Sequence, residues 1–134
     1  MKKLLFILLT TFLSSGIYAQ GNNLQFSQVL NYEYSSVSVQ GYVKTAVGSL
    51  TVPQNKVWKI SSGSSEELSG YRDASAIFVN NYLVFSIGDD FSTPNSNTPI
   101  WLNSGTYTVY LLNPESTARF ISGALSIVEF NIVQ

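Results

Sequence analysis

The stretch from Pro99 to Leu112, which reads PIWLNSGTYTVYLL, most narrowly limits the folds open to this chain. After Gly105, apolar and polar residues alternate with a period of two, as in a strand that has one face on a core. Asn103, Ser104 and Gly105 separate that strand from a shorter apolar one, and a glycine there can adopt the positive φ that a three-residue turn requires. The stretch therefore predicts a β-hairpin.

The remainder of the chain repeats this pattern of short alternating runs separated by turn-forming residues. A second hairpin is expected where Pro53 ends a short strand ahead of the run Val57–Ile60, and a third around the pair Asn80-Asn81, which suits positive φ. No segment has the length and the 3.6-residue period of an amphipathic helix. The sequence predicts an all-β chain of roughly eight or nine strands in a two-sheet antiparallel β-sandwich, with the jelly roll as the favoured topology.

The first and last strands raise the question of which residues face the core. In the first, the mostly apolar residues at even positions from Leu24 to Tyr34 share a parity, so we expect them on one face. In the last, the apolar residues between Leu125 and Val133 change parity, which predicts a bulge near Ser126 or burial on both faces.

The N-terminus predicts a secretory signal peptide over residues 1–19. Two lysines precede an apolar run from Leu4 to Leu13, and Ala19 is a small residue at the expected cleavage point. The run is shorter than the ~20 residues that a membrane-spanning helix needs. We therefore expect a secreted protein, extracellular or at the cell surface with the periplasm left open, that has a single β-sandwich domain over residues 20–134 and no membrane span.

Composition restricts the partners of that domain. Two of the seven basic residues lie in the signal peptide, which leaves five against eight acidic ones, so nucleic acid is not an expected partner. The chain has no cysteine, and stability must come from a packed core or from association between subunits. Charged residues make up 11% of the chain, against about 25% in typical soluble proteins. Such a surface favours self-association or a neutral partner such as a glycan.

Three segments carry a resemblance: VPQNKVWKI (Val52–Ile60), PIWLNSGTYTV (Pro99–Val109) and ISGALSIVEFNIV (Ile121–Val133). They resemble a pattern of short secreted bacterial β-sandwich proteins, in which the second segment usually has Pro-Ala-Gly at the turn. The strand, glycine turn, strand element is similar to that of C1q/TNF-type jelly rolls. The resemblance implies a trimer-forming or surface-displayed jelly roll, and it supplies no functional residues.

Catalytic chemistry is restricted by the absence of His and Cys, which excludes a Ser-His-Asp triad, a Cys-His pair and His-based metal sites. The carboxylates that could act as the acid and base of a glycosidase are Glu66-Glu67, Asp73 and Asp89-Asp90. They lie in or beside expected loops, where charge is expected for solvation alone, so we predict no enzymatic activity and no cofactor. Asp89, Asp90, Asn95 and Asn97 offer oxygen ligands that suit Ca²⁺, although their spacing matches no EF-hand. A solvated turn is the favoured interpretation, and a calcium site is the alternative.

Two sets of side chains are candidate interaction sites. Strand aromatics are candidates for a subunit interface: Trp101, Tyr107 and Tyr110. Loop residues without a core period are candidates for ligand binding: Tyr71, Arg72, Asp73, Asp89, Asp90 and Phe91. The favoured function is that of a non-catalytic structural or adhesive protein that forms a homo-oligomer, with a trimer as the favoured assembly. The alternative is a monomeric carbohydrate-binding module that uses the loop aromatics to stack on sugar.

Overall fold

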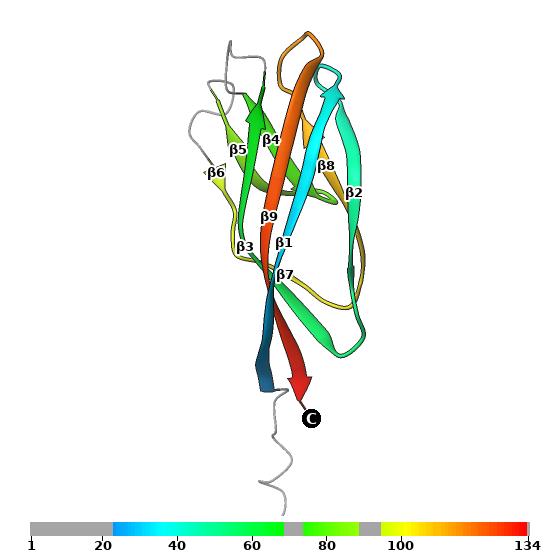
Figure 1. The fold of residues 1–134 in the computed structure, drawn as a ribbon, viewed down its shortest axis with the longest axis vertical. Coiled ribbons are helices and arrows are strands. Elements are labelled where there is room, and N and C mark those ends of the chain that lie inside the picture. Colours follow the sequence, from blue (N-terminus) through cyan, green and yellow to red (C-terminus); the bar gives the residue numbers. More distant parts are fainter. Residues whose placement is uncertain (1–22, 69–73, 89–94, 134) are drawn as a thin grey trace, which may run out of the picture.

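The computed structural model describes residues 23–68, 74–88 and 95–133 (Figure 1). These residues form strands and no helix, which confirms the all-β class. Accordingly, none of the described segments is a helix that could cross a membrane. The strands are β1 (Asn23–Val39), β2 (Lys44–Val52), β3 (Lys56–Glu67), β4 (Ser75–Val79), β5 (Tyr82–Ile87), β6 (Asn95–Ser96), β7 (Ile100–Leu102), β8 (Gly105–Leu112) and β9 (Arg119–Val133).

The strands form two antiparallel sheets with the orders β1-β9-β3-β7 and β2-β8-β4-β5-β6, which pack face to face (Figure 1). The first half of the chain pairs with the second half in reverse order: β1 with β9, β2 with β8, β3 with β7, and β4 with β5. Additional pairing of β3 with β9 and of β4 with β8 rolls this long hairpin into two layers. This is the jelly-roll arrangement, so the predicted sandwich and topology are confirmed.

Only one of the three predicted hairpins pairs its own two strands. β4 and β5 pair across Asn80-Asn81, and Asn80 has a φ of 51°. The turns at Pro53 and at Asn103–Gly105 instead carry the chain from one sheet to the other, so those two hairpin predictions were wrong. The reason is that turn residues determine where the chain reverses, and not which strand it then pairs with. Gly105 does adopt positive φ, at 148°.

The core lies between the sheets and consists of aliphatic side chains around one tryptophan. Trp58 is only 3% exposed. The sheets approach closely at inward-facing glycines: a Cβ on Gly123 would lie 2.9 Å from Cδ2 of Leu111, and one on Gly63 would lie 2.9 Å from Cγ1 of Val84. Side chains of one sheet therefore fill the space that glycines leave in the other.

Irregular pairing determines which residues of β1 and β9 face outward. In β1, a register shift between Phe26 and Gln28 changes the parity, so Phe26 is 60% exposed whereas Tyr32 packs on the core. The expectation of one face from Leu24 to Tyr34 was therefore wrong. β9 alternates without a break, and the shift near Ser126 lies in the neighbouring strand β3.

Candidate functional site

The predicted ligand-binding loop residues all lie outside the described residues: Tyr71, Arg72, Asp73, Asp89, Asp90 and Phe91. The same holds for the two aspartates of the calcium alternative. Asn97, a further member of that alternative, is exposed. Within the described part of the chain, no group of three or more acidic or histidine residues could hold a metal ion.

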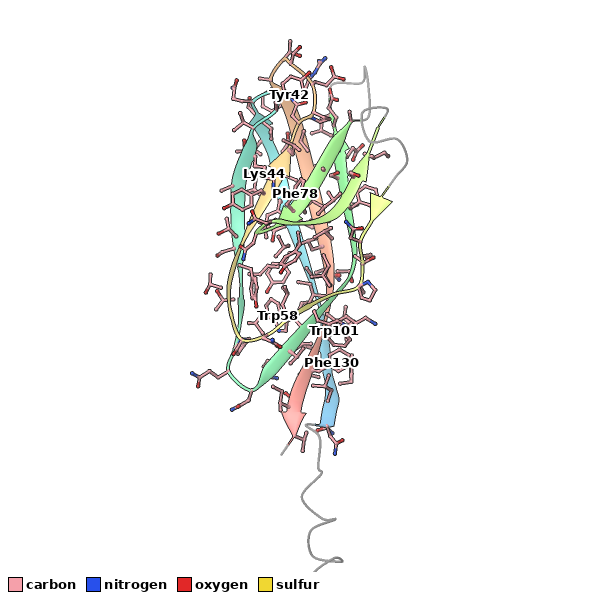
Figure 2. All side chains as sticks on the ribbon, turned by 180° about the vertical axis from the view of Figure 1, so that it is seen from behind. Tyr42, Lys44, Trp58, Phe78, Trp101 and Phe130 are labelled. Carbon is pink, nitrogen blue, oxygen red and sulfur yellow. The ribbon has the colours of Figure 1, made fainter. Side chains whose placement is uncertain are left out.

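The structure does not bring the three predicted interface aromatics together. Trp101 lies on β7, on the outer face of the four-stranded sheet, and its side chain is 50% exposed. Tyr107 packs against the core between the sheets. Tyr110 lies on the outer face of the other sheet, opposite Phe78, whose ring centroid is 3.9 Å from Nζ of Lys44 (Figure 2). Trp101 is apart because the chain changes sheets between β7 and β8, and Tyr107 and Tyr110 are apart because successive residues of β8 face opposite sides.

Trp101 instead belongs to an aromatic patch on the outer face of the four-stranded sheet. We define the aromatic patch as Phe26, Val29, Trp101, Val128 and Phe130. The rings of Trp101 and Phe130 lie 5.6 Å apart, tilted by 36°, and both residues lie toward the C-terminal end of β9 (Figure 2). Phe26 is opposite Phe130, and Val29, which is 53% exposed, is opposite Val128. Residues from three different strands thus form one exposed apolar surface.

Lys59 of β3 lies between members of the aromatic patch. It pairs in register with Trp101 on one side and with Val128 on the other, and its Nζ lies 5.5 Å from the Trp101 ring centroid. At that distance the ammonium is attracted by the electron-rich ring face. The patch therefore contains one positive charge, between Trp101 and Val128, within an otherwise apolar surface.

A polar trough continues the same face along β9. The central strand β9 carries small side chains at Ser122, Ala124 and Ser126. Longer side chains lie beside them, Asn31 and Glu33 on β1 and Glu66 on β3. Two shallow hollows result, of about 260 and 330 Å³. Side chains that could hydrogen-bond a ligand line them: Asn31, Glu33, Ser35, Ser62, Ser64, Glu66, Ser122 and Ser126.

Glu129 holds a network on the inner side, directly behind the aromatic patch. Glu129 is 3% exposed, and its two carboxylate oxygens accept four hydrogen bonds. Nε1 of Trp58 donates to Oε2 at 2.9 Å, and Nζ of Lys56 donates to Oε1 at 2.9 Å. Ser27 and Gln28 donate to Oε1 from β1 at 2.9 and 3.1 Å. The bulge in β1 brings both of these neighbouring residues onto one carboxylate, which joins three strands.

The protonation state of Glu129 follows from these bonds. Burial by itself would raise the pKa of the carboxyl, but the hydrogen bonds from Lys56, Trp58, Ser27 and Gln28 outweigh burial and lower the pKa to about 2. A carboxylate that stays ionised and accepts four hydrogen bonds is suited to holding strands together, and not to donating a proton at neutral pH. We assign Glu129 a structural role.

Tyr34 closes the side of the sandwich between β1 and β2. Its ring lies against Gly48, where a Cβ would be 2.8 Å from Cε1 of the ring. The buried hydroxyl finds no hydrogen-bond partner among the described residues. Burial, with a contribution from Tyr32, raises the pKa of Tyr34 to about 12. The phenol therefore remains neutral and serves packing.

Sequence reasoning missed the patch residues Phe26, Val29, Val128 and Phe130, and it missed the role of Glu129. One signal was present: Glu129 occupies the parity of Leu125 and Ile127, where an apolar residue is expected. A lone acid on a buried parity indicates a partnered carboxylate, and it also indicates that the neighbouring apolar residues face outward.

Comparison with known proteins identifies no relative. The chain matches no protein-family model, and no curated protein and no solved structure is similar enough to be matched to it. What the chain does must therefore follow from its own geometry, in which the aromatic patch and the polar trough share one sheet face.

Proposed function

We propose that the protein is a secreted, non-catalytic structural or adhesive protein that associates with further copies of itself through the aromatic patch. The observation that supports this most strongly is the exposure of Phe26, Val29 and Trp101, each half or more exposed on one sheet face. Contiguous apolar surface of this kind marks an interaction site in soluble proteins.

Burial of the aromatic patch between subunits would favour their association. Fully burying one large apolar side chain contributes about 1.5–3 kcal/mol, so covering the exposed halves of three of them contributes roughly 3 kcal/mol per subunit. The chain has no disulfide that could stabilise it in an oxidising compartment, and association would provide that stabilisation. A trimer remains our expectation for the assembly, from the resemblance to C1q/TNF-type jelly rolls.

Absolute mass by light scattering after size exclusion tests the proposal. The purified protein at micromolar concentration should be an oligomer, and the double substitution Phe26→Ser with Trp101→Ala should weaken association by at least tenfold. Tyr82→Ser is the matched control, because Tyr82 is 61% exposed but lies on the other sheet. An unchanged mass in the double variant, or a wild-type monomer at every concentration, would overturn the proposal.

A carbohydrate-binding module is the alternative, and one observation favours it. The aromatic patch adjoins the polar trough, so a glycan chain could stack on Trp101 and reach Asn31 or Glu33. This platform differs from the loop aromatics expected from the sequence, which lie outside the described residues.

Tryptophan emission tests the alternative. The chain has only two tryptophans, and Trp58 is buried. In a Trp58→Phe variant, emission therefore reports on Trp101 alone. A saturable change in that emission on titration with soluble polysaccharides would support glycan binding, and a flat response for a protein that is also monomeric would argue against both functions.

A further inference from the structure

We infer that β1 is an edge through which two copies of this chain pair strand to strand, antiparallel, about a two-fold axis at Asn31. The inference rests on the proposed self-association and adds a second contact to it. The aromatic patch lies on the outer face of the four-stranded sheet, whereas this contact uses the edge of that sheet.

β1 is a long strand at the edge of its sheet. It has 17 residues, and β9 is its only strand partner in the part of the chain that the structure describes. An edge strand presents a row of backbone N–H and C=O groups that can pair with another chain. The other edges offer less: β7 and β6 have three and two residues, and a register shift divides β2 into two shorter regular segments, Lys44–Ala46 and Gly48–Val52.

The composition of β1 does not protect this edge. Lysine and proline are the residues that most often prevent edge strands from pairing. Between Asn23 and Val39 there is no Lys, Arg or Pro, and Glu33 is the single charged residue. In a two-fold pair the same strand meets itself, so the position of Glu33 decides which registers avoid repulsion between like charges.

The irregularities of β1 select one register. Two register shifts interrupt the strand, and the regular segment between them, Gln28–Tyr34, has Asn31 at its midpoint. A two-fold axis at Asn31 pairs the whole segment with itself and keeps outward side chains opposite outward side chains. It places Glu33 opposite the partner's Val29, and away from the partner's Glu33.

The joined edges would make one continuous sheet from two four-stranded ones. Because outward faces stay outward, the aromatic patches of both copies would lie on the same side of that sheet and remain open. A two-fold contact through the edge, added to the contact through the aromatic patch, extends an assembly beyond either contact alone. A second copy of the chain fits this edge. Its own β1 has the length to pair with the whole regular segment, and in this register no two like charges lie opposite each other.

A charge-swap experiment tests the edge. Asn31 is exposed, so Asn31→Lys and Asn31→Asp should fold normally. Each variant alone places like charges on the two-fold axis and should weaken the edge contact at least tenfold, whereas an equimolar mixture of the two should restore the mass of the wild type. Ser49→Lys is the control, because it adds the same charge to an exposed position of β2, the edge strand of the other sheet.

Single cysteines provide a second readout in this cysteine-free chain. Directly opposite residues of antiparallel strands have Cβ atoms about 4.5–5.5 Å apart, close to the range that a disulfide spans. Asn31→Cys should therefore form a disulfide-linked dimer under mild oxidation, and Ser49→Cys should not.

The two proposals can fail separately. If the Asn31 variants keep the wild-type mass and Asn31→Cys does not cross-link, the edge contact is refuted, whatever the patch variants show. If the Asn31 variants dissociate while Phe26→Ser with Trp101→Ala does not, the edge stands and the patch is refuted. Dissociation by Ser49→Lys as well would show a general effect of charge and would also overturn the edge.

Discussion

Replacing Glu129 by glutamine keeps the shape of the side chain but removes its charge from the centre of three strands. The carboxylate uses one oxygen for Trp58 and the other for Lys56 and the β1 donors. A glutamine amide has only one accepting oxygen, and its NH₂ group must face donors at the other position. We therefore expect Glu129→Gln to lower the free energy of unfolding.

The magnitude follows from the burial of the donors. If the amide NH₂ faces Trp58, the indole N–H is buried without a partner, which costs about 1–3 kcal/mol. If it faces Lys56 instead, the cost is smaller, because that side chain is 26% exposed and can reach water. Loss of the charge-assisted bond adds roughly 1 kcal/mol in either orientation. The expected destabilisation is about 2 kcal/mol.

Urea unfolding followed by circular dichroism measures this loss. Glu66→Gln is the matched control, because Glu66 is an exposed glutamate on β3 and its replacement should change stability by less than about 0.5 kcal/mol. Trp58→Phe in a Glu129→Leu background should recover about 1 kcal/mol relative to Glu129→Leu alone, since it removes the orphaned donor. A loss below about 0.5 kcal/mol for Glu129→Gln would refute the structural role of this carboxylate.

Two further predictions concern stability. The folded pKa of Glu129 is about 2, below its ordinary value of 4.5, so its contribution is complete above pH 4.5 and is lost as the pH falls toward 2. Glu129→Gln should accordingly flatten the fall in melting temperature between about pH 5 and pH 2, and an unchanged slope would contradict the assignment. Gly123→Ala should cost about 1–3 kcal/mol, because its Cβ would lie 2.9 Å from Leu111 and 3.2 Å from Ile77. Ala124→Ser, which faces outward on the same strand, should leave the melting temperature nearly unchanged.

The alternation of apolar residues was sufficient to predict the strands, the two sheets and the jelly roll. It did not identify strand partners, because turn residues such as Pro53 and Gly105 serve equally in a hairpin and in a crossing between sheets. Partner choice depends on which apolar faces meet across the core. That is a property of the whole nested pairing of the chain, and it does not appear in any short segment.

The candidate site was harder to predict, because one inserted residue in β1 determines which of its side chains face outward. The bulge at Ser27 reverses the parity of β1, so Phe26 faces outward even though it shares even numbering with Tyr32, which packs partly buried against the core. Nothing in the alternation locates such a residue. The loop set around Tyr71 lies outside the described residues, so that part of the sequence interpretation stays a prediction.

The aromatic patch and the Glu129 network have a common origin in the last third of β9. Up to Ile127 the inward positions are apolar, and the outward ones from Ser122 to Ser126 are small. Beyond that point the polarity inverts, with Glu129 inward and Phe130 outward. This inversion does not favour folding, because an apolar residue at position 129 and a polar one at position 130 would bury more apolar surface. The bulge at Ser27 and Gln28 compensates for it by donating to the buried carboxylate, and the same bulge turns Phe26 outward beside Phe130. An inversion that is specifically compensated on its inner side supports the proposal that the outer side is kept apolar for a partner.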